Sequence, residues 1–438
     1  MTQCISLVLN VLFFASIFAS SVVNPKPANG SMPTNGSDLT NVQCRKPFID
    51  ILISPVIEGG TKNEIVLYWT VETLVPDPWI ILKNGSVEIF KFQMNSTTGS
   101  VETNFSYQNP AKPYSFKKQH LGYTAEYKQG VKGKVIATSS METNPTWMSD
   151  QAATIGELSI NNMFIPGTHD SGALTLNDTT SERRIQKYVM AQDEPVINQL
   201  IFGIRSLDLR VSYYGFRSHK FENLYINHGV SKVQPLCNVI NDVKAFLENT
   251  REILILDFHG FPVGFGGLKI PHTKPHDTLV DYLQKELGPF IAPPNLTWNA
   301  KLQDFWKINK TVILAYNNEK VLKKYSHLLW PPVYQRWGNC QEPDKLKAYM
   351  KNVFENPPEG PWSAQVELTA NAGKIITDKM KGLRQMAASI NYQVTEWFQT
   401  DWGKKCNIVA CDFFRNSGIV KTAISWNLRR AKNSSCDL

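Results

Sequence analysis

From about residue 148 onward, short apolar runs alternate with longer segments in which apolar residues recur at helical spacing. The predicted strands are residues 162–165, 204–211, 224–227, 252–258, 311–316, 364–368 and 407–413. The predicted helices are residues 235–248, 278–287, 344–352, 377–391 and 419–430. Strands that alternate with helices pair in parallel, so this rhythm predicts an α/β fold. The number of units suits a TIM-like (β/α) barrel.

The region before residue 144 has a different pattern, in which short apolar runs are separated by turn residues. The runs are residues 49–53, 64–70, 79–82, 86–92, 121–127 and 134–138. Asn84-Gly85 between two of them is typical of a β-hairpin turn. The chain is therefore predicted to carry a small all-β sandwich domain over residues 44–143, followed by the barrel over residues 144–438.

The start of the chain resembles a segment for export. An apolar run over residues 11–19 is too short to span a bilayer and is followed by the small residues Ser20 and Ser21. We predict a signal peptide over residues 1–21, cut near Ser21. Residues 22–43, rich in Asn, Ser, Pro and Gly, are predicted to form a disordered leader.

Two further features favour secretion. Glycosylation sequons occur at Asn29, Asn35, Asn84, Asn95, Asn104, Asn177, Asn295, Asn309 and Asn433. Without the signal peptide an even set of cysteines remains: Cys44, Cys237, Cys340, Cys406, Cys411 and Cys436. In an oxidising compartment such a set suggests disulfide bonds, with buried free thiols as the alternative. We expect a secreted, extracellular glycoprotein.

The polar residues of the predicted barrel are placed at or just beyond the ends of its strands. They are His169, Asp170, Asp208, Arg210, His228, Asp257, His259 and Asp412. Parallel strands are buried on both faces and their carboxyl ends meet at one mouth, where active sites are built. These side chains are therefore predicted to share one site.

Their chemical types indicate reaction at phosphorus. Two histidines can act as base and acid at neutral pH, because their ordinary pKa lies near 6.5. The guanidinium of Arg210 offers paired planar donors to a phosphate. Nearby carboxylates can orient the imidazoles. The pattern predicts a phosphodiester-cleaving site that uses no metal or other cofactor.

Three motifs resemble the X domain of phosphatidylinositol-specific phospholipases C. They are FIPGTHDS at residues 164–171, GIRSLDLR at 203–210 and NHG at 227–229, in that order, and the resemblance covers about residues 145–430. It implies that His169 is the general base for the inositol 2-hydroxyl and His228 the general acid for the leaving diacylglycerol oxygen. Arg210 matches the arginine of the metal-independent, bacterial-type members.

The same resemblance implies roles for three carboxylates. Asp208 is expected to orient the site around Arg210, Asp170 to partner the acid histidine, and Asp412 to partner the base. Asp257 stands where calcium-dependent members place a carboxylate ligand, so a metal stays open as an alternative.

Four residues are assigned less directly. Asp257 and His259 either line the substrate site or serve the fold, and Tyr316 and Glu367 are candidates for substrate binding or for structural roles. The inositol-binding residues of the bacterial enzymes are not recognisable, and Tyr316 stands at the end of the fifth strand, where the resemblance would place an arginine.

The expected partners are an inositol phospholipid or an inositol-lipid anchor as substrate and a transient membrane surface. The net charge of +8 favours anionic surfaces only weakly. No nucleic-acid partner is expected, and the sequence sets no oligomeric state. There are two alternatives to an inositol-lipid phospholipase C. One is an inactive lipid-binding module, and the other is a metal-dependent barrel phosphodiesterase acting on another phospholipid.

Overall fold

The computed structural model describes residues 46–57, 63–174, 186–215, 217–266 and 273–432. The predicted signal peptide and the whole of the predicted leader lie outside these residues. In the described part of the chain, no helix combines the length and the apolar character that crossing a bilayer requires.

The described residues begin with two antiparallel sheets. One has the strand order β1-β2-β5 and the other β4-β3-β6-β7. The bounds are β1 Phe48–Ile53, β2 Glu64–Thr70, β3 Pro78–Asn84, β4 Val87–Gln93, β5 Thr98–Ser106, β6 His120–Gln129 and β7 Lys134–Glu142. Residues of both sheets, such as Leu67 and Leu82, share one apolar core. The Asn84-Gly85 hairpin is confirmed, since Asn84 pairs with Val87 and Gly85 adopts a positive φ of 58°.

Strand β5 was not predicted. Its sequence, TGSVETNFS, has no apolar run, and the strand forms because it pairs along the edge of β2. The division of the chain into domains at residue 143 stays a prediction.

The rest of the chain is built on parallel strands in the order β13-β12-β9-β8-β16-β15-β14, each paired in parallel with its neighbours. The bounds are β8 Ile165–Thr168, β9 Ser206–Tyr213, β12 Leu254–Gly260, β13 Val312–Tyr316, β14 Tyr334–Trp337, β15 Trp362–Gln365 and β16 Ile408–Cys411. An isolated parallel bridge joins Ala315 of β13 to Trp330, and Gln335 of β14 donates a hydrogen bond to Asp257 of β12. The outermost strands of the parallel series, β13 and β14, therefore face each other.

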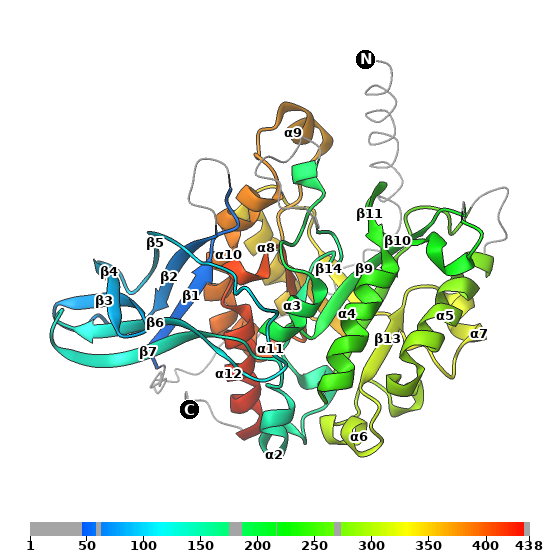
Figure 1. Cartoon of the computed structure of the whole chain (residues 1–438), viewed down its shortest axis with the longest axis horizontal. Coiled ribbons are helices and arrows are strands. Elements are labelled where there is room, and N and C mark those ends of the chain that lie inside the picture. The colour runs from blue at the N-terminus through cyan, green and yellow to red at the C-terminus, as the bar shows by residue number, and fades with distance from the viewer. Residues whose placement is uncertain (1–45, 58–62, 175–185, 216, 267–272, 433–438) are drawn as a thin grey trace, which may run out of the picture.

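Helices connect and cover these strands (Figure 1). Their bounds are α2 Ala152–Ile155, α3 Val196–Phe202, α4 Leu236–Asn249, α5 Thr273–Leu287, α6 Leu302–Lys307, α7 Glu319–Lys324, α8 Pro343–Glu355, α9 Ala372–Thr377, α10 Leu383–Gln399, α11 Asp401–Lys405 and α12 Ile419–Lys432. Helix α4 shows why they form, because its buried residues Leu236, Val239, Ile240 and Val243 recur at helical spacing on one face. The predicted mixed α/β fold is confirmed.

Several predicted elements need correction. The strand expected at 162–165 is β8, three residues later, because Ile160–Asn162 forms a 3₁₀ turn. The helix expected at 377–391 is two helices, α9 and α10, separated by residues with positive φ such as Gly382. Strand β14 was missed because it has only four residues, YQRW, and Gln335 and Arg336 leave it without an apolar run.

The strand expected at 224–227 is not a member of the parallel series. It is β10 (Leu224–His228), which pairs antiparallel with β9 and forms a hairpin with β11 (Ser231–Pro235). A parallel crossover takes a dozen or more residues, usually with a helix. The short connection from Tyr213 to Leu224 instead turns the chain straight back.

Candidate active site

The ends of adjacent parallel strands bring the predicted residues together. His169 and Asp170 follow β8, Asp412 follows the neighbouring β16, and Glu367 lies two residues beyond β15. Asp208 and Arg210 lie inside β9 rather than at its end, because pairing with β10 extends that strand. We call this end of the parallel strands the carboxyl edge.

His169 is buried and held by Asp412. The Nδ1 atom of His169 lies 2.7 Å from a carboxylate oxygen of Asp412. This bond leaves Nε2 of His169 for other partners, and an oxygen of Glu367 lies 3.9 Å from it. Burial lowers the pKa of His169, but the carboxylates of Glu367 and Asp412 outweigh it and raise the pKa to about 9. His169 is thus protonated at neutral pH.

His228 lies opposite, in a different environment. Its Nδ1 donates to the backbone carbonyl of Val189 at 2.7 Å, and its ring lies 5.8 Å from the His169 ring at an angle of 81°. Burial, the charge of Arg210 and that of His169 lower its pKa to about 3. His228 is thus neutral, and the two histidines together hold one proton.

Arg210 is fixed beside the histidines by Asp208. Its guanidinium donates through two nitrogens to both oxygens of Asp208, at 3.0 and 3.4 Å. Burial raises the pKa of Asp208, but Arg210 and His259 outweigh it and hold the carboxylate ionised. The predicted orientation of Arg210 by Asp208 agrees with this geometry.

His259 and Asp257 extend the cluster along β12. Nδ1 of His259 lies 3.3 Å from Asp208 and 3.4 Å from Asp257, and Asp257 is the register partner of Asp208 on the neighbouring strand. The imidazole therefore lies between two carboxylates that would otherwise repel each other. Both residues lie beside Asp208, and a role for them in lining the substrate site stays a prediction.

Asp170 does not occupy the predicted position. It was expected to partner His228, but that histidine bonds to Val189, and Asp170 lies 4.0 Å from Arg210 instead. Its backbone has a positive φ of 37°, a strained conformation found at functional sites. Burial raises the pKa of Asp170 to about 7, against the attraction of Arg210.

Tyr316 is not brought into this cluster. It is buried, its hydroxyl bonds to Nδ1 of His276 at 2.6 Å, and its ring packs against Phe258 and Phe261. Its contacts are those of a residue in the apolar core, as the structural interpretation predicted.

Gln192 was missed in the sequence analysis. Its buried amide donates to the backbone carbonyls of His169 and Cys411, at 3.0 and 2.9 Å. It thereby joins the segments that follow β8 and β16. No sequence pattern could have indicated it, because the bonds involve main-chain atoms about 20 and 220 residues away.

Two expectations about other groups can be compared with the described residues. Among these, no set of three or more His, Cys, Asp or Glu side chains is arranged to hold a metal ion.

The described cysteines have free thiols, so the predicted disulfide bonds do not form among Cys237, Cys340, Cys406 and Cys411. Burial raises the pKa of both Cys406 and Cys411 to about 12. Cys44 and Cys436 lie outside the described residues.

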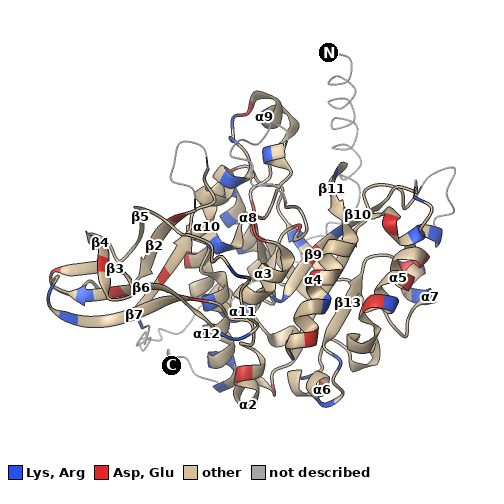
Figure 2. Cartoon of the chain, in the orientation of Figure 1, with Lys and Arg blue, Asp and Glu red and all other residues tan. Residues whose placement is uncertain are grey.

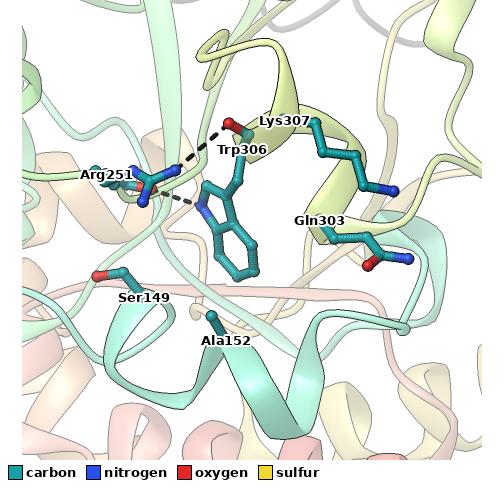
Figure 3. Close-up of a pocket in the computed structure, with 6 residues that line it drawn as sticks. All are labelled: Ser149, Ala152, Arg251, Gln303, Trp306 and Lys307. Atoms are coloured by element: carbon teal, nitrogen blue, oxygen red, sulfur yellow. Dashed lines mark hydrogen bonds between the residues drawn. The ribbon is translucent and has the colours of Figure 1, made fainter.

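A pocket of about 310 Å³ lies elsewhere (Figure 3). It is lined by Ser149, Ala152, Arg251, Gln303, Trp306 and Lys307. Arg251 and Trp306 precede β12 and β13, so the pocket lies at the amino ends of these strands. None of the candidate residues borders it.

The chain was compared with known proteins. No family model matches it. Human PI-PLC X domain-containing protein 1 is 26% identical over 327 residues, which is 67% of this chain and 98% of the human protein. Mouse PI-PLC X domain-containing protein 3 is 25% identical over 310 residues, 64% of this chain and 92% of the mouse protein.

Among solved structures, the F249X mutant of phosphatidylinositol-specific phospholipase C from Staphylococcus aureus aligns with a TM-score of 0.49 at 14% identity, covering 64% of this chain and 96% of that one. The matches to curated proteins confirm the resemblance that the three motifs carry. Over about two thirds of its length, this chain is similar to the PI-PLC X domain-containing proteins.

Proposed function

We propose that this protein is a phosphodiesterase that cleaves phosphatidylinositol, or a related inositol lipid, into diacylglycerol and inositol 1,2-cyclic phosphate. The observation that carries the proposal is the pair formed by the buried His169 and the half-buried His228, with rings 5.8 Å apart, beside the guanidinium of Arg210. The names of the relatives support the same class of substrate. The proposed architecture is a TIM-like barrel preceded by a small β-sandwich.

In this proposal Arg210 binds the lipid phosphate. Asp208 holds the guanidinium in one orientation through two nitrogens, which leaves the remaining N–H groups for a phosphate oxygen. A fixed positive charge in a buried site stabilises the charge that develops on phosphorus without reorganisation during the reaction. No step requires a metal ion.

The histidines transfer the protons. His169, oriented by Asp412, takes the proton of the inositol 2-hydroxyl while that oxygen forms a bond to phosphorus. The bond from phosphorus to the glycerol oxygen breaks, and His228 gives its proton to that oxygen. This requires the shared proton on His228 at the start. A bound phosphate anion favours that state because it raises the pKa of the imidazole beside it.

The product tests the proposal. The 2-hydroxyl is already part of the substrate and attacks with a large effective molarity, so phosphorus NMR of an early mixture should show the cyclic phosphate before any inositol 1-phosphate. Ring opening by water needs the same histidines in exchanged roles and should follow slowly. An analogue without the 2-hydroxyl should bind and stay intact.

Each alternative has its own outcome. If the acyclic phosphate appears first, water is the direct nucleophile and this mechanism is wrong. If EDTA stops the reaction and calcium restores it, the metal-dependent alternative replaces ours. If vesicles containing phosphatidylinositol are bound but never cleaved, the protein is a lipid-binding module.

A further inference from the structure

Glu367 is a buried carboxylate that the reaction above leaves unused. Its side chain is 3% exposed, and neither of its oxygens has a hydrogen-bond partner among the described residues. A buried polar group without a partner destabilises the folded state, and more so when it is charged. Such a group calls for a specific explanation, and a ligand that supplies the hydrogen bond is one.

The position of Glu367 limits what that ligand can be. Its Oε1 lies 3.9 Å from Nε2 of His169, too far for a direct hydrogen bond but close enough for both atoms to contact one small group. In the proposed reaction, Nε2 of His169 accepts the proton of the attacking hydroxyl. Two hydroxyls on adjacent carbons can each make a bond of about 2.8 Å, one to Nε2 and one to Glu367.

We propose that Glu367 accepts a hydrogen bond from the substrate hydroxyl next to the attacking one, and so selects headgroups in which that hydroxyl is present and free. If the attacking group is the inositol 2-hydroxyl, its neighbour is the 3-hydroxyl. This inference rests on the proposed function and adds a specificity-determining residue to it.

The surrounding charges fit a headgroup that carries no phosphate at this position. Asp412 lies on the other side of His169, at 2.7 Å from Nδ1. A phosphate on the 3-hydroxyl would bring its charge against both carboxylates, while Arg210 is engaged with Asp208 and the reacting phosphate. A neutral hydroxyl donates a hydrogen bond at the same place.

A merely structural role for Glu367, as a counter-charge for His169, makes a different prediction. In that case, replacing Glu367 would change the rate of cleavage of every substrate by the same factor. The readout must therefore be the ratio of kcat/KM between phosphatidylinositol and its 3-deoxy analogue, measured on one preparation in the same mixed micelles. This ratio does not depend on how much of a variant is correctly folded.

The wild-type protein should favour phosphatidylinositol over the 3-deoxy analogue by about 10- to 100-fold, the range for a hydrogen bond to a charged group. Glu367→Gln should reduce this preference and Glu367→Ala should abolish it, bringing the ratio near one. Glu359→Gln, which removes an exposed carboxylate, is the matched control and should keep the wild-type ratio.

The outcomes separate this inference from the proposed function. One outcome is that wild-type protein cleaves phosphatidylinositol while all three variants keep the wild-type preference for it over the 3-deoxy analogue. In that case Glu367 does not contact the hydroxyl, and this inference is overturned while the proposed function stands. If wild-type protein cleaves no inositol lipid, the proposed function is overturned and the inference with it.

Discussion

At the scale of single residues, the two histidines differ more than their common type suggests. His169 is buried between two carboxylates, whereas His228 bonds to a backbone carbonyl and faces cationic neighbours. The same side chain is therefore protonated at one position and neutral at the other. A pair that holds one proton can both accept and donate a proton within one turnover.

The roles of the histidines can be separated by the leaving group. His169→Ala and His228→Ala should each lower turnover of phosphatidylinositol by about 10² to 10⁴-fold. With a nitrophenyl ester in place of the glycerol, the leaving oxygen needs no proton, so His228→Ala should regain most of its activity and His169→Ala should not. If the His169 variant recovered its activity instead, His169 would be the general acid and His228 the general base.

The pH dependence follows from the same pair. The active state holds one proton, which is lost as the pH rises through the pKa of His169, about 9. We expect kcat/KM for a soluble substrate to fall above pH 9. Asp412→Asn removes a carboxylate that raises this pKa, so the decline should begin at lower pH. The control variant Glu359→Gln should decline at the same pH as the wild type. If Asp412→Asn also declines at the wild-type pH, the mechanism is contradicted.

At the scale of elements, apolar side chains are exposed around the carboxyl edge. Val230 follows the end of β10, Trp337 ends β14, and Ile376 lies on α9, with exposed fractions of 36, 44 and 50%. Helix α9 and strand β11 project at the same upper end of the molecule in Figure 1. Large apolar side chains exposed around the proposed lipid site favour contact with a bilayer surface.

This arrangement predicts a difference between membrane-bound and soluble substrates. Val230→Ser together with Ile376→Ser should lower activity on vesicles about tenfold or more, since apolar area no longer enters the bilayer. Activity on soluble inositol cyclic phosphate should not change. Ile308→Ser is the matched control, because Ile308 is equally exposed, at 45%, but follows α6 at the amino ends of the strands. Equal loss in the control variant would argue against a membrane-contacting rim.

At the scale of the whole molecule, the antiparallel sheets are joined to the helices at the end of the chain. Lys421 of α12 pairs with Asp50 of β1 at 2.6 Å, and Tyr68 of β2 stacks on Tyr392 of α10. Basic side chains are spread over both parts of the chain rather than gathered on one face (Figure 2). The net charge of +8 therefore identifies no single binding surface.

The outer surface also carries the sequons that support our proposal of secretion. Asn84, Asn95, Asn104, Asn295 and Asn309 are all exposed, and none lies on the segments around the carboxyl edge. Protein secreted from animal cells should lose mass on treatment with a peptide N-glycosidase, and replacing each asparagine by glutamine should remove one step of that shift. Protein whose mass is unchanged by the glycosidase would remove this support for secretion.

The sequence by itself determined the class of fold and most of the site. Strand and helix periodicities depend on neighbouring residues, so the α/β rhythm and the positions of His169, His228, Arg210 and Asp412 could be read without the structure. Contacts between distant segments could not. The antiparallel course of β10, the short strand β14 and the burial of Tyr316 away from His169 and His228 depend on contacts that no local pattern encodes.

Two arginines of one motif show the physical reason. Arg205 and Arg210 are five residues apart, yet Arg205 is buried against Glu252 at the start of its strand, and Arg210 reaches the histidines farther along it. The charge of each is the same, but its role depends on the carboxylate that the fold places beside it, which is Glu252 of a distant segment for Arg205 and the neighbouring Asp208 for Arg210. Only the tertiary structure decided that Asp170 lies by Arg210 rather than by His228, and that Glu367 is left without a partner beside His169.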